Sequence, residues 1–354
     1  MSIREVRVHN VRSYELFSAQ FHPGVTLILG KNGSGKTTLL ETLYVLYRGT
    51  SFRGRDRDMI GHDKDRAEIK IVFDSGEERR MSLVAEQQKA SKEFVVDGKK
   101  SARLPSRSRL PVVLFEPDEL RLLSSSPQRR RDFLDGILAR LYPSYSTLLS
   151  RYSRTLLQRN ELLKQHETMP TEAWETQLFA WDVKFAELAA KIVDARWQFV
   201  ELSNRHLSRL YSQLAKASHT VAVQYSLPTD SLQHYQQNLF AQLQTSHVAD
   251  AYRGYTSHGP HRDDFTIMLD AHAAAETASR GEMRTIMLAY KLLEVELQHE
   301  LTSQPPLILM DDVFSELDIT RELALMHALE PYQTIITATD LRNELKTDAR
   351  SIEL

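Results

Sequence analysis

The sequence predicts an α/β protein, with a phosphate-binding core, an attached antiparallel β layer and an inserted, mainly α-helical lobe. Residues 25–43 read as a strand, a glycine-rich loop and a helix, and the loop from Gly30 to Thr37 matches G-x-x-x-x-G-K-T. Residues 307–312 form an apolar run that ends in two aspartates. None of the 13 glycines lies between Gly136 and Gly254, where apolar residues recur at helical spacing.

Composition narrows the class of protein before any motif is considered. Hydrophobic residues make up 42% of the 354 residues, which is enough to bury a core. The absence of cysteine excludes disulfides and cysteine-ligated zinc, and it fits a reducing compartment. No run approaches the roughly 18 apolar residues of a membrane span. At the N-terminus, apolar and polar residues alternate, whereas a signal peptide would have a continuous apolar stretch there. We therefore expect a soluble, cytoplasmic protein that has no membrane partner.

The glycine-rich loop has the residues that a phosphate site needs. Gly30, Gly33 and Gly35 allow a tight turn that presents backbone N–H groups, and the following helix directs its positive N-terminus at the same anion. Lys36 is expected to contact the β- and γ-phosphates, and the Thr37 hydroxyl is expected to bind Mg²⁺. The predicted nucleotide contacts are Gly30, Lys31, Asn32, Gly33, Ser34, Gly35, Lys36, Thr37 and Thr38.

Alternating segments on either side of the loop predict the β layer. Residues 3–21 read as two strands, and shorter alternating runs follow at 69–73, 81–85 and 94–96. The last run ends at Asp97-Gly98, a strong hairpin signal.

Two basic stretches are candidates for DNA contact. Residues 98–115 contain five cations and no acidic residue, and the polar loop at 48–58 is rich in arginine. Uncompensated cations suit phosphate contacts, although a solvated loop face explains the same pattern. The candidates, chosen from charge alone, are Arg53, Arg55, Arg57, Lys99, Lys100, Arg103, Arg107 and Arg109.

The middle of the chain reads as a helical bundle. Ser126-Pro127 predicts a helix start, and Arg129–Arg131 near that start suggest either an anionic partner or pairing with Asp132 and Asp135. From Trp174 to Leu202, apolar residues step by four and three in a heptad seam. In the polar loop at 255–265, His258 and His261 favour a structural role over metal binding, because no third ligand is specified.

The C-terminal part of the chain contains the acidic residues that a P-loop needs to bind a metal ion and to activate a water. Asp311 ends its strand where α/β sheets bind ligands, so it is expected to hold Mg²⁺, and Asp312 is placed to orient or deprotonate a water. These three residues, Lys36, Asp311 and Asp312, are the candidate catalytic groups. Ser279 and Gly281 begin an amphipathic helix and form a possible anion site.

A P-loop, an S-x-G motif at Ser279 and an acid-ended strand followed by Ser315–Asp318, in that order, resemble the ABC-type ATPases of the SMC-like branch. The head of such an ATPase would comprise residues 1–116 and 251–354, and the helical lobe residues 117–250. Within that branch the chain resembles the RecF family of bacterial recombination mediators. That resemblance rests on residues 8–14, 30–37, 49–53, 115–120, 126–134, 259–264 and 311–318.

The resemblance implies a protein that uses ATP and Mg²⁺ and forms an ATP-dependent homodimer, in which Ser279 of each copy contacts the nucleotide of the other. It further implies binding to double-stranded and gapped DNA, and help with recombinase loading alongside RecO- and RecR-type mediators. The sequence departs from the motifs of these families at three places. Arg280 and Glu282 replace expected glutamines. Asp312 replaces a longer glutamate, which predicts slow hydrolysis. No histidine occurs at 337–340 and no glutamine at 115–117.

Other functions are compatible with a P-loop. The main alternative is the ATPase subunit of a membrane transporter, which the helical insert and the absent histidine disfavour. A small-molecule kinase would leave Ser279-x-Gly281 and Ser315–Asp318 unexplained. A binding module without turnover remains an option, because the sequence shows a site and no rate.

Overall fold

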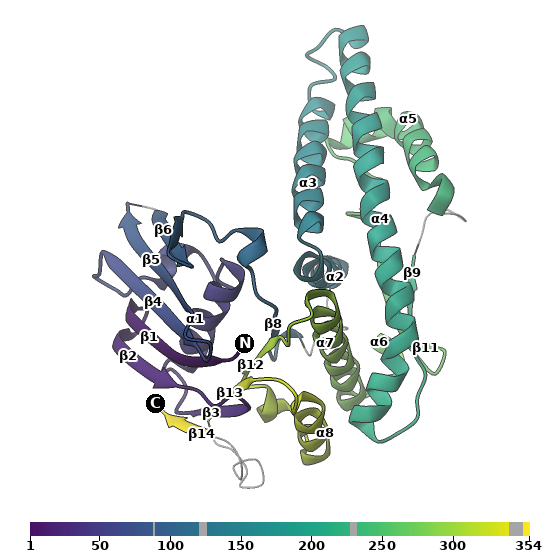
Figure 1. Ribbon diagram of the computed structural model, residues 1–354. Helices are drawn as coiled ribbons and strands as arrows, with labels where there is room; N and C mark the ends of the chain where they lie inside the picture. Colours follow the sequence, from purple (N-terminus) through teal and green to yellow (C-terminus); the bar gives the residue numbers. More distant parts are fainter. Residues whose placement is uncertain (88, 120–125, 227–231, 340–349) are drawn as a thin grey trace. The chain divides into compact units, whose positions relative to one another are not determined.

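The computed structural model describes residues 1–87, 89–119, 126–226, 232–339 and 350–354 (Figure 1). The chain forms two compact units, each made from segments that are distant in sequence. The first comprises Met1–Leu120, Gln213–Ala217 and Met287–Leu354, and the second comprises Arg121–Ser212 and Ser218–Ile286.

A five-stranded parallel sheet forms the centre of the first unit. Its order is β14 (Arg350–Glu353), β3 (Val25–Leu29), β13 (Thr334–Ala338), β12 (Leu307–Asp311) and β8 (Val112–Phe115). The inner strands are nearly continuous apolar runs, as expected for parallel strands that are covered on both faces. Because β3 and β12 both pair with β13, the P-loop and the acidic strand end lie at the same edge.

The predicted antiparallel layer is a six-stranded sheet in the same unit. Its order is β2 (Tyr14–Gln20), β1 (Ile3–Val11), β4 (Arg66–Phe73), β5 (Glu78–Glu86), β6 (Lys89–Val96) and β7 (Lys99–Ser101). Asp97 and Gly98 form the predicted hairpin turn, with φ of 50° and 72°, which suits a type I′ turn. Helix α1 (Lys36–Arg48) contributes Leu39, Leu40 and Leu43 to a core shared with both sheets. Helix α8 (Ile319–Leu329) follows β12.

The second unit is mainly helical, as predicted. It contains α2 (Pro127–Leu141), α3 (Pro143–Leu163), α4 (Thr171–Ala215) up to Ser212, α5 (Tyr235–Arg253) and α6 (Ala274–Thr277). A small antiparallel sheet joins β9 (Val221–Tyr225), β10 (Phe265–Leu269) and β11 (His272–Ala273). Helix α7 (Arg280–Thr302) begins in this unit and continues in the other.

The compact units divide the chain differently from the predicted lobe boundary at residue 250. Residues 251–286 belong with the helices because β10 pairs with β9, from Phe265↔Tyr225 to Leu269↔Val221. Arg130 on α2 also donates to Asp264, with Nε 2.9 Å from Oδ1. A strand pairing across forty residues leaves no local signal in the sequence.

Two of the three arginines at the start of α2 contact the loop that precedes β10. Arg130 binds Asp264, and Arg131 donates to the backbone carbonyl of Asp263 at 2.7 Å. Asp135 instead accepts two hydrogen bonds from Arg196 on α4, at 2.9 and 2.8 Å. The basic N-terminus of α2 is therefore bound to the loop that precedes β10.

A buried arginine joins three helical segments of the second unit. Arg159 on α3 is fully buried and donates to Asp182 on α4 at 2.6 Å and to Asp250 on α5 at 3.2 Å. It also donates to the Thr256 hydroxyl at 2.8 Å. Burying charges is tolerated only when they are paired, so these bonds fix how α3, α4 and α5 pack.

Replacing Arg159 by leucine should lower the free energy of unfolding of the second unit by about 3–5 kcal/mol, because Asp182 and Asp250 would remain buried without a cation. Urea unfolding followed by helical circular dichroism measures this change. The matched control is Lys164→Ala, which removes the exposed 2.7 Å pair with Glu161 and should cost less than about 1 kcal/mol. Equal shifts in the two variants would show that the buried pairs do not hold the helices together.

Candidate functional site

The P-loop lies between β3 and α1, as the sequence predicts. Gly33 and Gly35 have φ of 85° and 102°, in the left-handed region that favours glycine. A Cβ atom at Gly35 would lie 2.8 Å from the ring of Tyr14, so the backbone passes too close to that ring for any side chain. The loop therefore leads directly into the first turn of α1, where backbone N–H groups are available to an anion.

Lys36 is almost buried at the base of this loop, with 7% of its surface exposed. Its Nζ donates to the backbone oxygens of Gly30 at 2.6 Å and Lys31 at 3.0 Å. The ammonium is thus held over the loop by two carbonyl groups. This is where a phosphate bound to the loop would receive a positive charge.

The acidic strand end meets the loop through one side-chain hydrogen bond. Thr37 Oγ1 donates to Asp311 Oδ1 at 3.0 Å, joining residues that are 274 positions apart. Thr337 on β13 donates to the same oxygen at 2.8 Å, and it is the register partner of Asp311. A hydroxyl and a carboxylate held together are hard oxygen ligands of the kind that Mg²⁺ binds in P-loop proteins.

Asp312 adopts a strained backbone conformation beside this pair. Its φ of 52° lies in the left-handed region, and its N–H donates to the carbonyl and the hydroxyl of Thr337, at 3.2 and 3.0 Å. Burial raises the pKa of its carboxyl; Lys36 opposes this rise and Asp311 adds to it. Strain held by a second strand is a common property of functional sites.

These groups line one cavity of about 410 Å³, which falls within the size range of small-molecule sites. All of its lining residues belong to the first unit. They are Arg12, Ser13, Asn32, Gly33, Gly35, Lys36, Thr37, Thr38, Arg53, Pro117, Asp311 and Asp312. The structure therefore brings together the predicted loop, the predicted metal ligands and the predicted water-activating group.

Two arginines of this cavity were not assigned to it from the sequence. Arg12 donates two hydrogen bonds to the buried carboxylate of Glu41 on α1, at 2.6 and 2.9 Å. The Ser51 hydroxyl also donates to Glu41, at 2.5 Å, and its own oxygen accepts from the N–H of Arg53. Glu41 thus anchors the loop that carries Arg53, a residue chosen as a DNA candidate. The 29-residue separation of Arg12 and Glu41 gave no sequence signal for this pairing.

Glu116 is a further group that the sequence did not assign. It follows β8, whose register with β12 pairs Phe115 with Met310 and so places Glu116 beside Asp311. Burial raises the pKa of Glu116 to about 7, with Glu119 and Asp311 acting in the same direction and Lys291 opposing. Glu116 stands where the resemblance leads one to expect a glutamine. Asp340, near the expected histidine position, lies outside the described residues.

The S-x-G residues lie in the second unit, at the start of α7. Ser279 is exposed and forms a capping box with Glu282. The N–H of Ser279 donates to Glu282 Oε2 at 2.7 Å, and the N–H of Glu282 donates to Ser279 Oγ at 3.3 Å. The departure at Glu282 therefore has a local structural role, while Ser279 and Gly281 occupy the predicted helix start.

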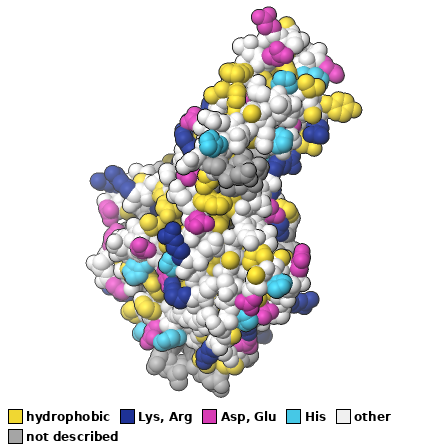
Figure 2. Space-filling view, turned by 90° about the vertical axis from the view of Figure 1, so that its right-hand side faces the viewer, with side chains coloured by type: hydrophobic (Ala, Val, Ile, Leu, Met, Phe, Trp, Pro, Cys, Tyr) yellow, Lys and Arg dark blue, Asp and Glu magenta, His cyan; other side chains and the backbone are white. Residues whose placement is uncertain are grey.

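The predicted basic strip includes the edge strand β7 and a short 3₁₀ turn at Ser106–Ser108. Lys99, Arg103 and Arg107 are exposed, Arg109 is half-buried, and Lys100 pairs with Glu93 at 3.1 Å. Figure 2 shows cationic and anionic side chains interspersed over one face of the molecule, in keeping with a net charge of −2. A role of this strip in DNA binding stays a prediction.

His261 is integrated into the core of the second unit. Its Nδ1 lies 2.7 Å from the Tyr152 hydroxyl and its Nε2 lies 3.1 Å from the carbonyl of Thr256. Burial lowers the pKa of His261 to about 4, so the ring is neutral at physiological pH. Both ring nitrogens are engaged by protein groups, which supports the structural role.

Comparison with known proteins extends over nearly the whole chain. Residues 2–352 match the model of the RecF/RecN/SMC N-terminal domain. A DNA replication and repair protein RecF from Exiguobacterium sp. is 34% identical over 351 residues, covering 96% of this chain and 93% of that protein. A solved structure of the recombination mediator protein RecF with ATP, of the RecFOR pathway, is 28% identical with a TM-score of 0.83, covering 97% of this chain and 93% of the other.

A more distant match supports the fold class alone. An Smc head domain from Pyrococcus furiosus is 18% identical with a TM-score of 0.51, over 99% of this chain and 93% of the other. Within the part of the chain that the structure describes, no helix is both long enough and apolar enough to cross a bilayer. The fold is thus an α/β ABC-type ATPase head with a helical lobe, and the chain belongs to the RecF family of DNA replication and repair proteins.

Proposed function

We propose that this protein is an ATP-dependent DNA-binding protein of recombinational repair and replication restart that acts in the cytoplasm. The observation that carries the nucleotide part is the 3.0 Å bond from Thr37 to Asp311, in a cavity shared with Lys36 and Asp312. The similarity to a RecF structure containing ATP supports it. Family membership gives no support to a transporter subunit or a small-molecule kinase.

The residues of the cavity have distinct tasks in this proposal. Thr37 and Asp311 would hold Mg²⁺, which supplies charge neutralisation at the β- and γ-phosphates. Lys36 and the loop N–H groups bind and orient the phosphates. Asp312 orients the attacking water and accepts its proton. Its side chain is one methylene shorter than the glutamate of many ABC-type ATPases and reaches the water less well, so hydrolysis is slow and ATP acts as a switch.

The second part of the proposal is an ATP-dependent homodimer on double-stranded or gapped DNA. The exposed Ser279 at a helix start offers a hydroxyl and backbone N–H groups to the nucleotide of a second copy. DNA would be contacted through its backbone by the basic strip and by Arg55 and Arg57. On DNA the dimer assists recombinase loading with RecO- and RecR-type mediators, and the RecFOR pathway of the related structure supports that role.

The ATPase of the purified protein should turn over far below the ~10 s⁻¹ that is typical of enzymes. Asp312→Asn should lower this rate about 100-fold or more while leaving ATP affinity nearly unchanged. Since the base must be ionised and its pKa is raised, the wild-type rate should fall on acidification at a higher pH than an ordinary aspartate would give. Phosphate release, followed at several ATP concentrations and across pH 4–9, measures the two rates, the dependence on ATP and the pH profile. A rate in the tens per second, or an unaffected Asp312→Asn, contradicts the assignment.

Ser279→Arg should abolish ATP-dependent dimerisation while the variant still binds ATP as a monomer, because a bulky cation replaces the hydroxyl that contacts the partner's nucleotide. Analytical ultracentrifugation with and without ATP, Mg²⁺ and duplex DNA measures the dimer, and a fluorescent ATP analogue measures binding. Thr277→Arg, at a nearby exposed position, is the matched control. A dimer that survives Ser279→Arg removes Ser279 from the interface.

Arg107→Ala should reduce the slope of log-affinity against log-salt for duplex DNA by about 0.9, which is the loss of one phosphate contact. Fluorescence anisotropy at four or more salt concentrations gives the slope. Arg4→Ala removes an exposed arginine of β1 outside the strip and should leave the slope unchanged. If the slope of Arg107→Ala equals that of the control, the residue makes no DNA contact.

A further inference from the structure

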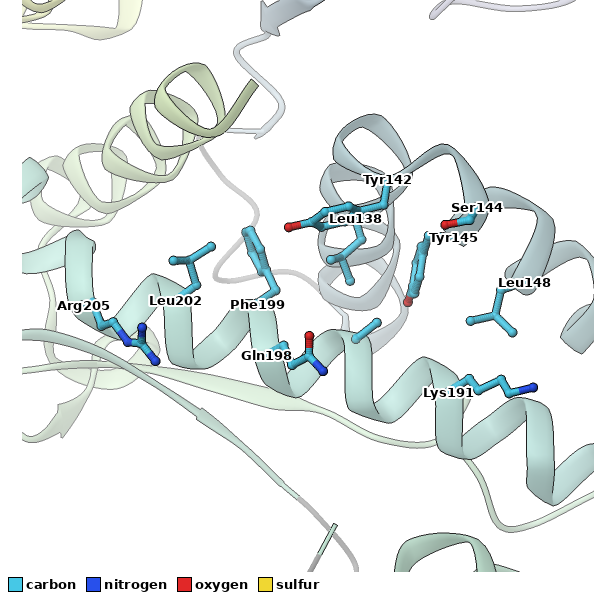
Figure 3. Close-up of a pocket in the computed structure, with 11 residues that line it drawn as sticks. Leu138, Tyr142, Ser144, Tyr145, Leu148, Lys191, Gln198, Phe199, Leu202 and Arg205 are labelled. Carbon is cyan, nitrogen blue, oxygen red and sulfur yellow. The ribbon is translucent and has the colours of Figure 1, made fainter. Parts of the chain in front are cut away.

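Two cavities lie along α3 and α4 in the second unit and take no part in the nucleotide site. The larger, of about 530 Å³, lies between α4 and the corner that joins α2 to α3 (Figure 3). The smaller, of about 270 Å³, lies further along the same two helices. Together their linings contain five cations and no acidic residue. The cations are Arg151, Arg154, Lys184, Lys191 and Arg205.

Helical spacing places both cavities on one face of the helix pair. The α3 residues that line them, from Ser144 to Gln158, recur mainly at intervals of three or four. The α4 residues, from Trp181 to Arg205, recur mainly at intervals of three, four or seven, so they too share a face. At 1.5 Å per residue this α4 stretch is about 36 Å long. We refer to the face defined by these two linings as the α3–α4 groove.

The charge of the groove is only weakly compensated. From Pro143 to Asn160, α3 contains no acidic residue. On α4, Asp194 accepts a hydrogen bond from Gln198 at 2.9 Å. Glu187 pairs with Lys191 at 2.5 Å, while both side chains remain at least half exposed. An exposed pair of this kind is weak, so a polyanion can compete for Lys191 at little cost. The groove therefore has the charge of a phosphate-binding surface.

Aromatic rings lie among these cations. In Figure 3 the rings of Tyr142, Tyr145 and Phe199 point into one hollow, and Lys191 and Arg205 lie at opposite ends of the α4 stretch below it. Tyr142 is 39% exposed, so its ring is accessible to a ligand. Trp181 is half-buried in the smaller cavity, where Lys184 Nζ lies 5.3 Å from the ring centroid. Each cavity is thus lined by at least one partly exposed aromatic ring and at least one cation.

We propose that the α3–α4 groove binds single-stranded DNA, with phosphates on its cations and unstacked bases on Tyr142 and Trp181. Cations that follow the backbone, together with aromatic rings on which bases stack, are what single-strand binding requires. A duplex keeps its bases stacked internally and has no use for the rings. The length of the groove suits several nucleotides, within the roughly 4–16 that single-strand sites cover. The inference rests on the proposed function, because it assigns the single strand of a gap to this groove.

The first test removes three cations of the smaller cavity at once, in the variant Arg151→Ala/Arg154→Ala/Lys184→Ala. With a fluorescent oligothymidylate, the slope of log-affinity against log-salt should fall by about 2, because each single-strand phosphate contact contributes about 0.7. Arg253→Ala, an exposed arginine of α5 outside the groove, is the control and should change nothing. Circular dichroism confirms that the variants are folded. An unchanged slope in the triple variant overturns the proposal.

The second test examines stacking. Tyr142→Ala should weaken oligothymidylate binding about 5- to 150-fold, since one stacked base contributes about 1–3 kcal/mol. Oligothymidylate should also quench the tryptophan fluorescence of the full chain. Trp181→Phe should remove this quenching while a second ring keeps binding nearly intact, and Trp174→Phe should not. Quenching that persists in Trp181→Phe, or unchanged affinity in Tyr142→Ala, contradicts the proposal.

Further measurements distinguish a failure of this inference from a failure of the proposed function, and distinguish a single-strand site from a protein-binding site. ATP-dependent duplex binding and dimerisation should persist in the groove variants. If wild-type protein lacks both, the proposed function fails, whereas if only the single-strand effects are missing, the groove assignment fails. A helical peptide rich in glutamate and leucine is the competitor. If it binds wild type, loses affinity in the groove variants and leaves oligothymidylate binding untouched, the groove is a protein site and the proposal is overturned.

Discussion

The hydrogen bond between Thr37 and Asp311 is the contact on which the nucleotide site depends. It joins the first turn of α1 to the end of β12, and its geometry follows from strand order, because β13 lies between β3 and β12 and supplies Thr337 to the same carboxylate. A shift of one residue in the β12–β13 register would reverse the direction of Asp311. The site is therefore as precise as the parallel sheet that holds it.

The sequence located the local parts of this arrangement. The strand, loop and helix expected within residues 25–43 and the hairpin turn at Asp97-Gly98 are all present, since periodicity and glycine-rich turns are local properties. The sequence could not predict the partners of Arg12, the surroundings of Glu116 or the pairing of β9 with β10. Each depends on which distant segment packs alongside, and an isolated sequence shows charge and spacing without showing the neighbour. Arg53 illustrates this, because charge alone suggested DNA and the fold places it on the nucleotide cavity.

The heptad-spaced apolar residues of α4 do not all belong to the bundle core. Its apolar positions predict a bundle core, and Leu178, Phe185 and Ile192 are buried as expected. Trp181 and Leu202 remain half-buried and line the cavities of the α3–α4 groove. Heptad spacing shows that a face is apolar but cannot show how much of it the partner helix covers. The part that α3 leaves open is available to a ligand, and the cations beside it favour an anionic one.

Carboxylates crowd the nucleotide cavity in a way that suits a switch. Asp311 raises the pKa of both Glu116 and Asp312, so adding negative charge here is costly. Lys36 opposes this effect at Asp312, and a bound cation would oppose it at all three carboxylates. A cation held by Thr37 and Asp311 would therefore lower the pKa of Asp312 and favour its ionised form. If Asp312 accepts the proton as proposed, occupancy of the metal position would control the protonation state of this carboxylate as well as the charge around the phosphates.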